Sequence, residues 1–136
     1  MLPRTKDYLI NFARSLIYTT ALSESAVADI LVSLELVQRD RQKQVDLLRN
    51  IDHYGALARS LNLPFQDHSP IQYLPVSGND QVREAAVELT RNRFRVVPIL
   101  HPTVPEGMER IRVSLHAYNR TKDIDDLLET FQKHVS

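Results

Sequence analysis

The chain has 136 residues, of which 43% are hydrophobic and 25% are charged, proportions typical of a folded globular protein. Its 17 basic side chains balance its 17 acidic ones, which argues against a dedicated nucleic-acid-binding protein. The lack of cysteine excludes a disulfide framework, a thiolate zinc site and a cysteine nucleophile. No apolar run is long enough to span a membrane, and the N-terminus lacks the apolar core of a signal peptide. We therefore expect a cytoplasmic protein.

The first half of the chain predicts helices. Apolar side chains at helical spacing in residues 7–17 predict a short helix. A much longer helix is expected over residues 23–63, and either Ser23 or Ser25 can cap its start. A helix of about 40 residues exceeds the usual globular length. It therefore predicts a connection between two bodies of structure.

Three features divide this long helix along its length. Residues 38–44 are polar on all sides, so this part is expected to be solvated. Gly55 lowers helix propensity and is expected to mark a bend. Asn62 and Pro64 are expected to end the helix.

The second half predicts a mixed fold. The elements expected in chain order are a strand over 69–76, a helix capped by the turn at 77–80, strands over 94–99 and 110–116, and a helix capped by Thr121. This β-α-β-β-α order predicts an α+β fold, with a small, mostly antiparallel three-stranded sheet that has its helices on one face.

The most informative element is the strand that begins at Arg110. Apolar residues alternate with polar ones, so one face packs against helices while Arg110 and Arg112 lie on the other. Arginine suits carboxylates and phosphates because its planar fork donates paired hydrogen bonds. The alternative is an ordinary solvated sheet face, and the alternation by itself favours that alternative.

Two other segments carry weaker signals. The loop 101–107 is stiffened by two prolines and has Thr103 near its centre, as would suit a substrate lid, although the pattern by itself favours a plain connector. Thr19 and Thr20 could offer hydroxyls to a phosphate, or they could simply belong to a capping segment. The five histidines show no metal-ligand spacing, and three glycines are too few for a phosphate-binding glycine loop.

Several motifs stand together in one order. They are Arg95-Val96-Val97-Pro98-Ile99, Pro102-Thr103-Val104-Pro105-x-Gly107, Arg110-Ile111-Arg112-Val113-Ser114-Leu115 and Asp123-Ile124-Asp125. This set resembles the C-terminal end of the α-oxoamine synthases, a family of fold-type I enzymes that depend on pyridoxal phosphate (PLP). The segment 16–21 also resembles the stretch that follows the Schiff-base lysine in that family. The resemblance covers essentially the whole chain.

The resemblance implies an activity and roles for particular residues. The family condenses an amino acid with an acyl-CoA, with loss of CO2, and PLP serves as the electron sink. Arg112 would bind the carboxylate of the amino acid, and Thr103 would belong to a mobile loop that closes over the site. Thr19 and Thr20 would contact the PLP phosphate, often from the neighbouring subunit of a dimer. Arg110 is given a structural, loop-anchoring role.

The chain also departs from the family pattern. The Schiff-base lysine is missing, because the lysines present are at positions 6, 43, 122 and 133, and none has the family's Ser/Thr-rich setting. The aspartate that pairs with the pyridine nitrogen and the histidine that stacks on the ring are missing too. Arg93 stands where relatives often have glycine at a helix-to-strand turn, so Asn92 is expected to take the left-handed conformation there.

We therefore expect the C-terminal portion of a PLP-dependent acyltransferase. Residues 1–22 would be a remnant of the large PLP-binding domain, 23–63 the connecting helix and 64–136 the small C-terminal domain. The 136 residues should hold no catalytic residue or metal, should bind no PLP on their own and should be inactive. Uncovered apolar patches should make the chain self-associate, and the full enzyme should be a homodimer. The alternative is a stand-alone binding or dimerisation module, in which Arg110 and Arg112 bind an anionic partner.

Overall fold

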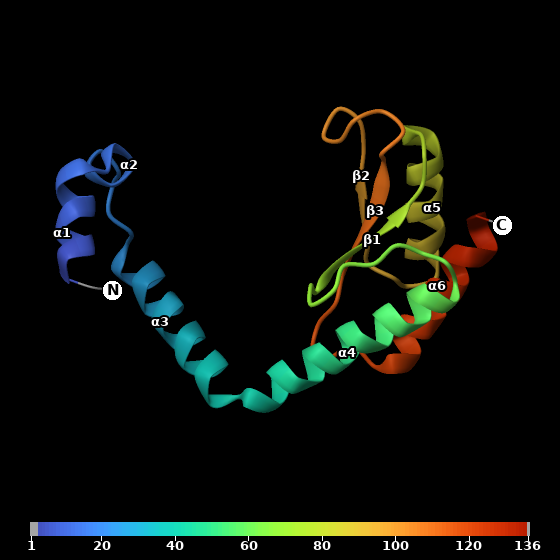
Figure 1. Cartoon of the computed structure of the whole chain (residues 1–136), viewed down its shortest axis with the longest axis horizontal. Helices are drawn as coiled ribbons and strands as arrows, with labels where there is room; N and C mark the ends of the chain where they lie inside the picture. The colour runs from blue at the N-terminus through green and yellow to red at the C-terminus, as the bar shows by residue number, and fades with distance from the viewer. Residues whose placement is uncertain (1–2, 136) are drawn as a thin grey trace. The chain divides into compact units, whose positions relative to one another are not determined.

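The computed structural model describes residues 3–135. The chain divides into two compact units, Met1–Arg39 and Asp40–Ser136. Figure 1 labels their helices and strands in chain order. No helix within residues 3–135 is long and apolar enough to cross a membrane.

The first unit consists of the helices α1 (Pro3–Phe12), α2 (Arg14–Ile17) and α3 (Glu24–Arg39). The helix expected over 7–17 is interrupted at Ala13, which adopts an extended conformation. Of the two expected caps for α3, Ser23 is the one whose hydroxyl accepts a hydrogen bond, from the Ala26 N–H at 3.3 Å. This satisfies one of the free N–H groups at the start of α3.

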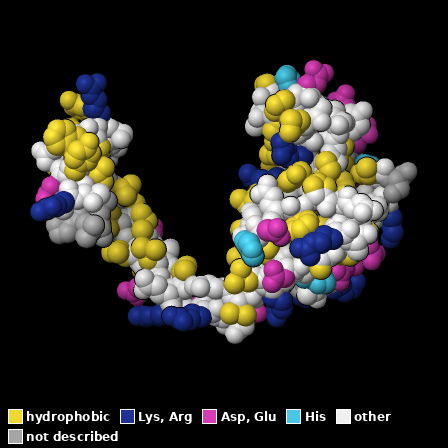
Figure 2. Space-filling model, viewed as in Figure 1, with side chains coloured by type: hydrophobic (Ala, Val, Ile, Leu, Met, Phe, Trp, Pro, Cys, Tyr) yellow, Lys and Arg dark blue, Asp and Glu magenta, His cyan; other side chains and the backbone are white. Residues whose placement is uncertain are grey.

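The first unit has no hydrophobic core within its described residues. No residue of α2 or α3 is buried, and large apolar side chains lie exposed along the unit. Figure 2 shows them as yellow atoms over these helices. Among the exposed ones are Tyr8, Phe12, Leu16, Tyr18, Leu22, Leu31, Leu34 and Leu36. Exposing this much apolar surface to water is unfavourable, so these side chains indicate a surface that packs against other protein.

The long helix expected over 23–63 is two helices in the structure. It breaks at Asp40, and α4 spans Arg41–Ser60. The Asp40 carboxylate accepts the Lys43 N–H at 3.2 Å and lies 3.0 Å from the Lys43 ammonium, and the hydrogen bonds and charge of Lys43 lower the pKa of Asp40. A new N-cap therefore forms within the polar run. Helix α4 continues unbroken through Gly55, whose backbone lies against the ring of Phe65.

Helix α4 ends as the sequence predicts. Asn62 adopts a left-handed conformation, with φ of 54°. Its N–H donates to Arg59 O at 3.2 Å, and the Leu63 N–H donates to Ala58 O at 2.8 Å. This is the Schellman pattern that satisfies the last carbonyls of a helix.

The second unit is α+β, as expected. Its strands are β1 (Ile71–Pro75), β2 (Val97–Ile99) and β3 (Arg110–Ser114), and its remaining helices are α5 (Asn79–Arg91) and α6 (Thr121–Val135). The sheet is antiparallel with the order β1-β3-β2, so β3 is the central strand. Figure 1 shows α5 and α6 lying on one side of the sheet. The opposite face carries Arg112.

One hydrophobic core joins the sheet to the helices α4, α5 and α6. Burial alternates along β3, where Ile111 and Val113 are buried while Arg112 and Ser114 are exposed. The members of the core, apart from these two, are Ile51, Tyr54, Ala58, Leu74, Val82, Ala85, Leu89, Leu115, Ile124, Leu127, Leu128 and Phe131. Burial of each large side chain stabilises the fold by about 1.5–3 kcal/mol, so this face holds the strand in place.

Asn50 is a polar residue within the apolar face of α4. It is 0% exposed, and its amide nitrogen donates to His116 O at 3.0 Å and Asn119 O at 2.8 Å. These bonds fix the turn between β3 and α6 against α4. One feature of the sequence indicates this role. Asn50 places an amide on the same helix face as the apolar residues Leu47, Ile51 and Tyr54, where a buried side chain is expected.

Two expected caps in the second unit are wrong. Asn92 has φ of −84°, and Arg93 instead takes the left-handed conformation with φ of 69°. The Arg93 N–H bonds to Thr90 O and the Phe94 N–H bonds to Leu89 O, both at 2.9 Å, so the register of the Schellman pattern places Arg93 at the turn. At α6, Asp123 accepts the Arg120 N–H at 3.0 Å, and Thr121 is already helical.

Candidate functional site

Arg112 lies at the centre of the open sheet face. On β3 it is opposite Tyr73 of β1 and Val97 of β2. Its side chain is exposed, and among residues 3–135 no hydrogen bond or ion pair to its guanidinium is formed. Because its neighbours Ile111 and Val113 are anchored in the core, a strand rather than a loop holds this cation. The five donors of the guanidinium are therefore available for a carboxylate.

Arg110 lies two residues away on the same face, but its side chain has protein partners. Its Nε donates to Met108 O at 3.2 Å, and its guanidinium carbon lies 5.1 Å from the centre of the Tyr73 ring. The hydrogen bond ties the strand to the preceding loop. The two arginines thus differ, and Arg112 is the one with a free fork.

Thr103 lies in the exposed loop between β2 and β3, which we call the 100–108 loop. The loop contains two tight turns: Thr103 N–H donates to Leu100 O at 2.8 Å, and Met108 N–H donates to Pro105 O at 3.0 Å. The His101–Pro102 peptide bond is cis. Thr103 and Arg112 therefore belong to the same unit. Thr103 lies in the loop that precedes β3, and Arg112 lies on β3 itself.

A buried carboxylate stands at the base of this loop. Glu109 is 3% exposed, and its Oε2 accepts the Gly78 N–H at 3.1 Å. This bond, together with N–H groups of Glu109 itself and of Gly107, lowers the pKa of Glu109 more than burial raises it. Gly78 has φ of 91°, a conformation that glycine adopts at little cost. Glu109 is thus an ionised structural group rather than a proton donor.

Thr19 and Thr20 lie in the first unit, after α2. Both are exposed, and the Thr19 hydroxyl donates to the Ser15 carbonyl. They belong to a different unit from Arg112 and Thr103, so their expected role toward a phosphate stays a prediction.

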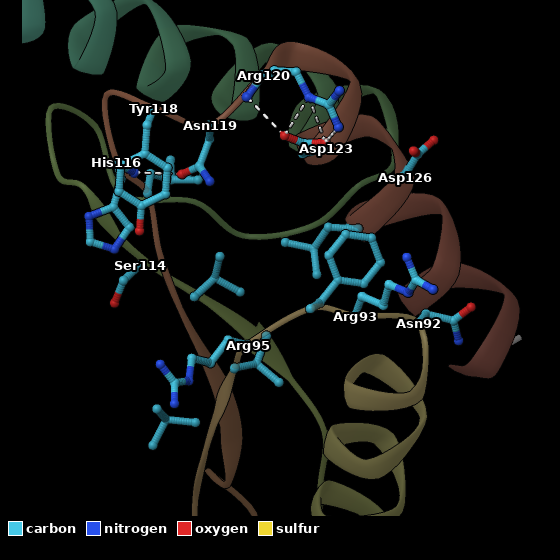
Figure 3. Close-up of a pocket in the computed structure, with 16 residues that line it drawn as sticks. Asn92, Arg93, Arg95, Ser114, His116, Tyr118, Asn119, Arg120, Asp123 and Asp126 are labelled. Atoms are coloured by element: carbon cyan, nitrogen blue, oxygen red, sulfur yellow. Dashed lines mark hydrogen bonds and ion pairs between the residues drawn. The ribbon is translucent and has the colours of Figure 1, made fainter.

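A surface pocket of about 700 Å³ lies beyond the end of β3 and contains none of the four expected site residues. Figure 3 shows Arg93 and Arg95 on one side of it, and Arg120 bonded to Asp123 on another. The rings of His116 and Tyr118 stack with their centres 4.8 Å apart. The pocket lies where the hydrogen-bonded pairing of β2 with β3 has ended, beyond the pair Val97 and Arg112. The end of this pairing could not be located from the sequence, so the sequence did not indicate the pocket.

The chain's own lysines do not fit a PLP site. Lys43, Lys122 and Lys133 are exposed and pair with acidic side chains one turn away, and no lysine lines any of the three pockets described. Lys6, on α1, is exposed as well. Residues 3–135 also hold no cluster of three potential metal ligands.

Solved structures define the class of fold. The chain aligns with an 8-amino-7-oxononanoate synthase from Francisella tularensis at a TM-score of 0.81 and 28% identity, covering 99% of this chain and 40% of that one. A serine palmitoyltransferase with its PLP internal aldimine aligns at a TM-score of 0.79 and 20% identity, covering 97% and 34%. The second unit thus has the fold of the C-terminal domain of fold-type I PLP enzymes, and the expected fold class is confirmed.

Sequence relatives narrow the class. The chain is 36% identical over 133 residues to the 8-amino-7-oxononanoate synthase of Emericella nidulans, covering 93% of this chain and 32% of the relative. It is 38% identical over 130 residues to that of Methylococcus capsulatus, covering 95% and 34%. The chain is therefore homologous to 8-amino-7-oxononanoate synthases, and the resemblance to the α-oxoamine synthases is confirmed. It spans about a third of the length of these relatives. No family model matches the chain.

Proposed function

We propose that this chain supplies the amino-acid-binding domain of a PLP-dependent acyltransferase of the 8-amino-7-oxononanoate synthase type, an enzyme of biotin biosynthesis. The complete enzyme joins an amino acid to an acyl-CoA with loss of CO2. The observation that carries the proposal is the free guanidinium of Arg112 on the central strand, in a chain homologous to these synthases over more than nine-tenths of its length.

Arg112 binds and orients the carboxylate of the amino acid. The pair is charge-assisted and can be bidentate, so it fixes both the position and the rotation of the substrate. Arg110 keeps the strand and the loop in register through Met108 and Tyr73. The 100–108 loop, with Thr103, closes over the bound substrate and excludes water. PLP, when bound, stabilises the negative charge that develops on the substrate carbon.

The remaining parts of the site come from other segments. The lysine that holds PLP is supplied from outside this chain, and Thr19 and Thr20 contact the phosphate across a homodimer interface. The exposed apolar side chains of α1–α3 support this assembly, because they need a protein partner to cover them. The enzyme works in the cytoplasm, and the 136 residues alone are inactive and bind no PLP.

A chimaera tests the proposal. The chain replaces the matching third of the Methylococcus capsulatus synthase, to which it is 38% identical. We expect alanine-dependent release of CoA from an acyl-CoA, whereas the chain alone, mixed with PLP and both substrates, releases none above background. A chimaera that folds and shows the absorbance of bound PLP, but releases no CoA, would refute the proposal.

A further inference from the structure

The 100–108 loop is exposed, yet both of its ends are bonded to one short turn. Within the loop, residues 101–103 and 105–108 are exposed, so little packing holds it. Its two internal turns shape the loop but do not fix it to the domain. Besides the packing of Leu100 on the core and the bond from Arg110 to Met108 O, hydrogen bonds from Ser77-Gly78-Asn79, which we call the 77–79 turn, fix the loop.

Asn79 holds the first end of the loop with both atoms of its amide. Its Oδ1 accepts the His101 N–H at 2.9 Å, and its Nδ2 donates to His101 O at 3.3 Å. These residues are 22 positions apart in the sequence. A side-chain amide is the group that can satisfy a backbone N–H and C=O of one residue together.

Ser77 and Gly78 hold the second end. The Ser77 hydroxyl donates to Gly107 O at 3.2 Å, and the Gly78 N–H donates to the buried carboxylate of Glu109 at 3.1 Å. Just outside the loop, the Val76 N–H donates to Glu109 O at 3.3 Å. The loop is therefore fixed to the turn at its start and at its end.

The turn itself is rigid because it begins α5. Asn79 is the first residue of that helix, and Val82 and Ala85 in the following turns are buried in the core. A bond from Asn79 thus relates the loop to the core rather than to another mobile segment. The loop tip, where Thr103 lies, is free to move only as far as the Asn79 and Ser77 bonds allow.

We propose that Asn79 is a positioning residue, which sets the place of Thr103 by holding His101 against the start of α5. The effect on catalysis rests on the proposed function, because Thr103 meets the substrate only there. The effect on the loop does not rest on it, since the bonds exist in this chain.

Hydrogen exchange of the 136-residue chain tests the loop directly. In Asn79→Ala we expect the His101 amide to exchange about tenfold faster, because loss of a hydrogen bond opens that amide. The amides of Leu74 and Val82 should keep their rates. Asn79→Asp keeps the acceptor for the His101 N–H and suits a helix start, so it should restore most of the protection.

Asn92→Ala is the matched control, since Asn92 lies at the other end of α5 and its side-chain amide donates to Glu88. This substitution should leave the exchange rate of the His101 amide unchanged. An Asn79→Ala chain whose His101 amide exchanges at the original rate would overturn the proposal, as would an equal effect from Asn92→Ala.

The chimaera separates this inference from the proposed function. There, Asn79→Ala should lower kcat about tenfold while the chimaera stays folded, and Asn79→Asp should recover activity. Faster exchange at His101 in a chimaera without any synthase activity would refute the proposed function and leave the loop's attachment standing. Faster exchange with an unchanged kcat would refute the positioning role.

Discussion

Arg93 gives a sharp test of the reasoning about local structure, because a non-glycine residue occupies the left-handed position after α5. Its φ is 69°, whereas that of Asn92 is −84°. A side chain in this conformation costs about 1–2 kcal/mol. The Arg93 side chain is exposed and forms no hydrogen bond or ion pair within the described residues, so its removal sacrifices little.

Replacing Arg93 with glycine should therefore stabilise the second unit. Glycine removes the conformational cost in the folded state, but it lowers the free energy of unfolding by about 0.4–1 kcal/mol because it gives the unfolded chain more freedom. The net gain is about 0.5–1 kcal/mol, or a rise of about 4 °C in melting temperature for a unit of this size. Thermal unfolding followed by circular dichroism, together with urea titration, measures it.

Asn92→Gly is the matched variant. It should destabilise the unit by about 1 kcal/mol, because Asn92 is right-handed and its amide donates to the carbonyl and carboxylate of Glu88, both at 3.0 Å. A chain stabilised by Asn92→Gly and weakened by Arg93→Gly would show that the left-handed residue is Asn92 and would refute the prediction.

Three further predictions concern the core, the pH and the first unit. Asn50→Ala should cost about 2–3 kcal/mol in urea unfolding, because it leaves His116 O and Asn119 O without their donor; a loss below 0.5 kcal/mol, roughly that of a surface change, would refute the role of Asn50. Because the pKa of Glu109 is lowered in the folded state, its stabilising contribution is complete above the ordinary glutamate pKa of about 4.3 and is lost as pH falls through the folded-state value. The urea midpoint of unfolding should therefore depend less on pH in Glu109→Gln than in the original chain between pH 5 and about pH 3. An equal pH dependence in the two chains would contradict this. The exposed apolar side chains of α1–α3 should make the chain self-associate, and light scattering that shows a monomer at all concentrations would count against it.

The elements that the sequence predicts well are those whose own pattern decides them. The alternation from Arg110 to Ser114 places Ile111 and Val113 inside and Arg112 outside, as the structure confirms. The stripe of Ile124, Leu127, Leu128 and Phe131 likewise defines the buried face of α6. In both, a single periodicity separates core from solvent over the whole element.

The features that the sequence does not reveal depend on contacts or on close local competition. The break at Asp40 arises because a helix with no apolar face there gains more from a new cap than from continuation, although the residues themselves are good helix formers. Only three residues of the strand expected over 94–99 pair with β3, since Phe94 turns toward the core after the Schellman turn. The bonds between Asn79 and His101 join positions that no local pattern relates.

The candidate site follows the same division. The alternation placed Arg112 on the exposed face, as observed. The role that we propose for it comes from the family resemblance and stays a prediction. The sequence could place Thr103 in a loop. It could not show the hydrogen bonds from Asn79 and Ser77 that hold the two ends of that loop. Thr19 and Thr20 lie in a unit whose large apolar side chains are exposed, so the part in a site that we propose for them depends on protein outside this chain.

The most direct test of the central claim is the apparent KM for alanine in the chimaera, measured for Arg112 and for its Arg112→Ala variant. We expect the substitution to raise KM by at least about 30-fold, which corresponds to about 2 kcal/mol for losing one side of a charge pair, while bound PLP and the melting temperature stay as they were. Arg110→Ala, which removes the neighbouring arginine, should change KM far less. An unchanged KM for alanine in a folded, PLP-loaded Arg112→Ala chimaera would contradict the account.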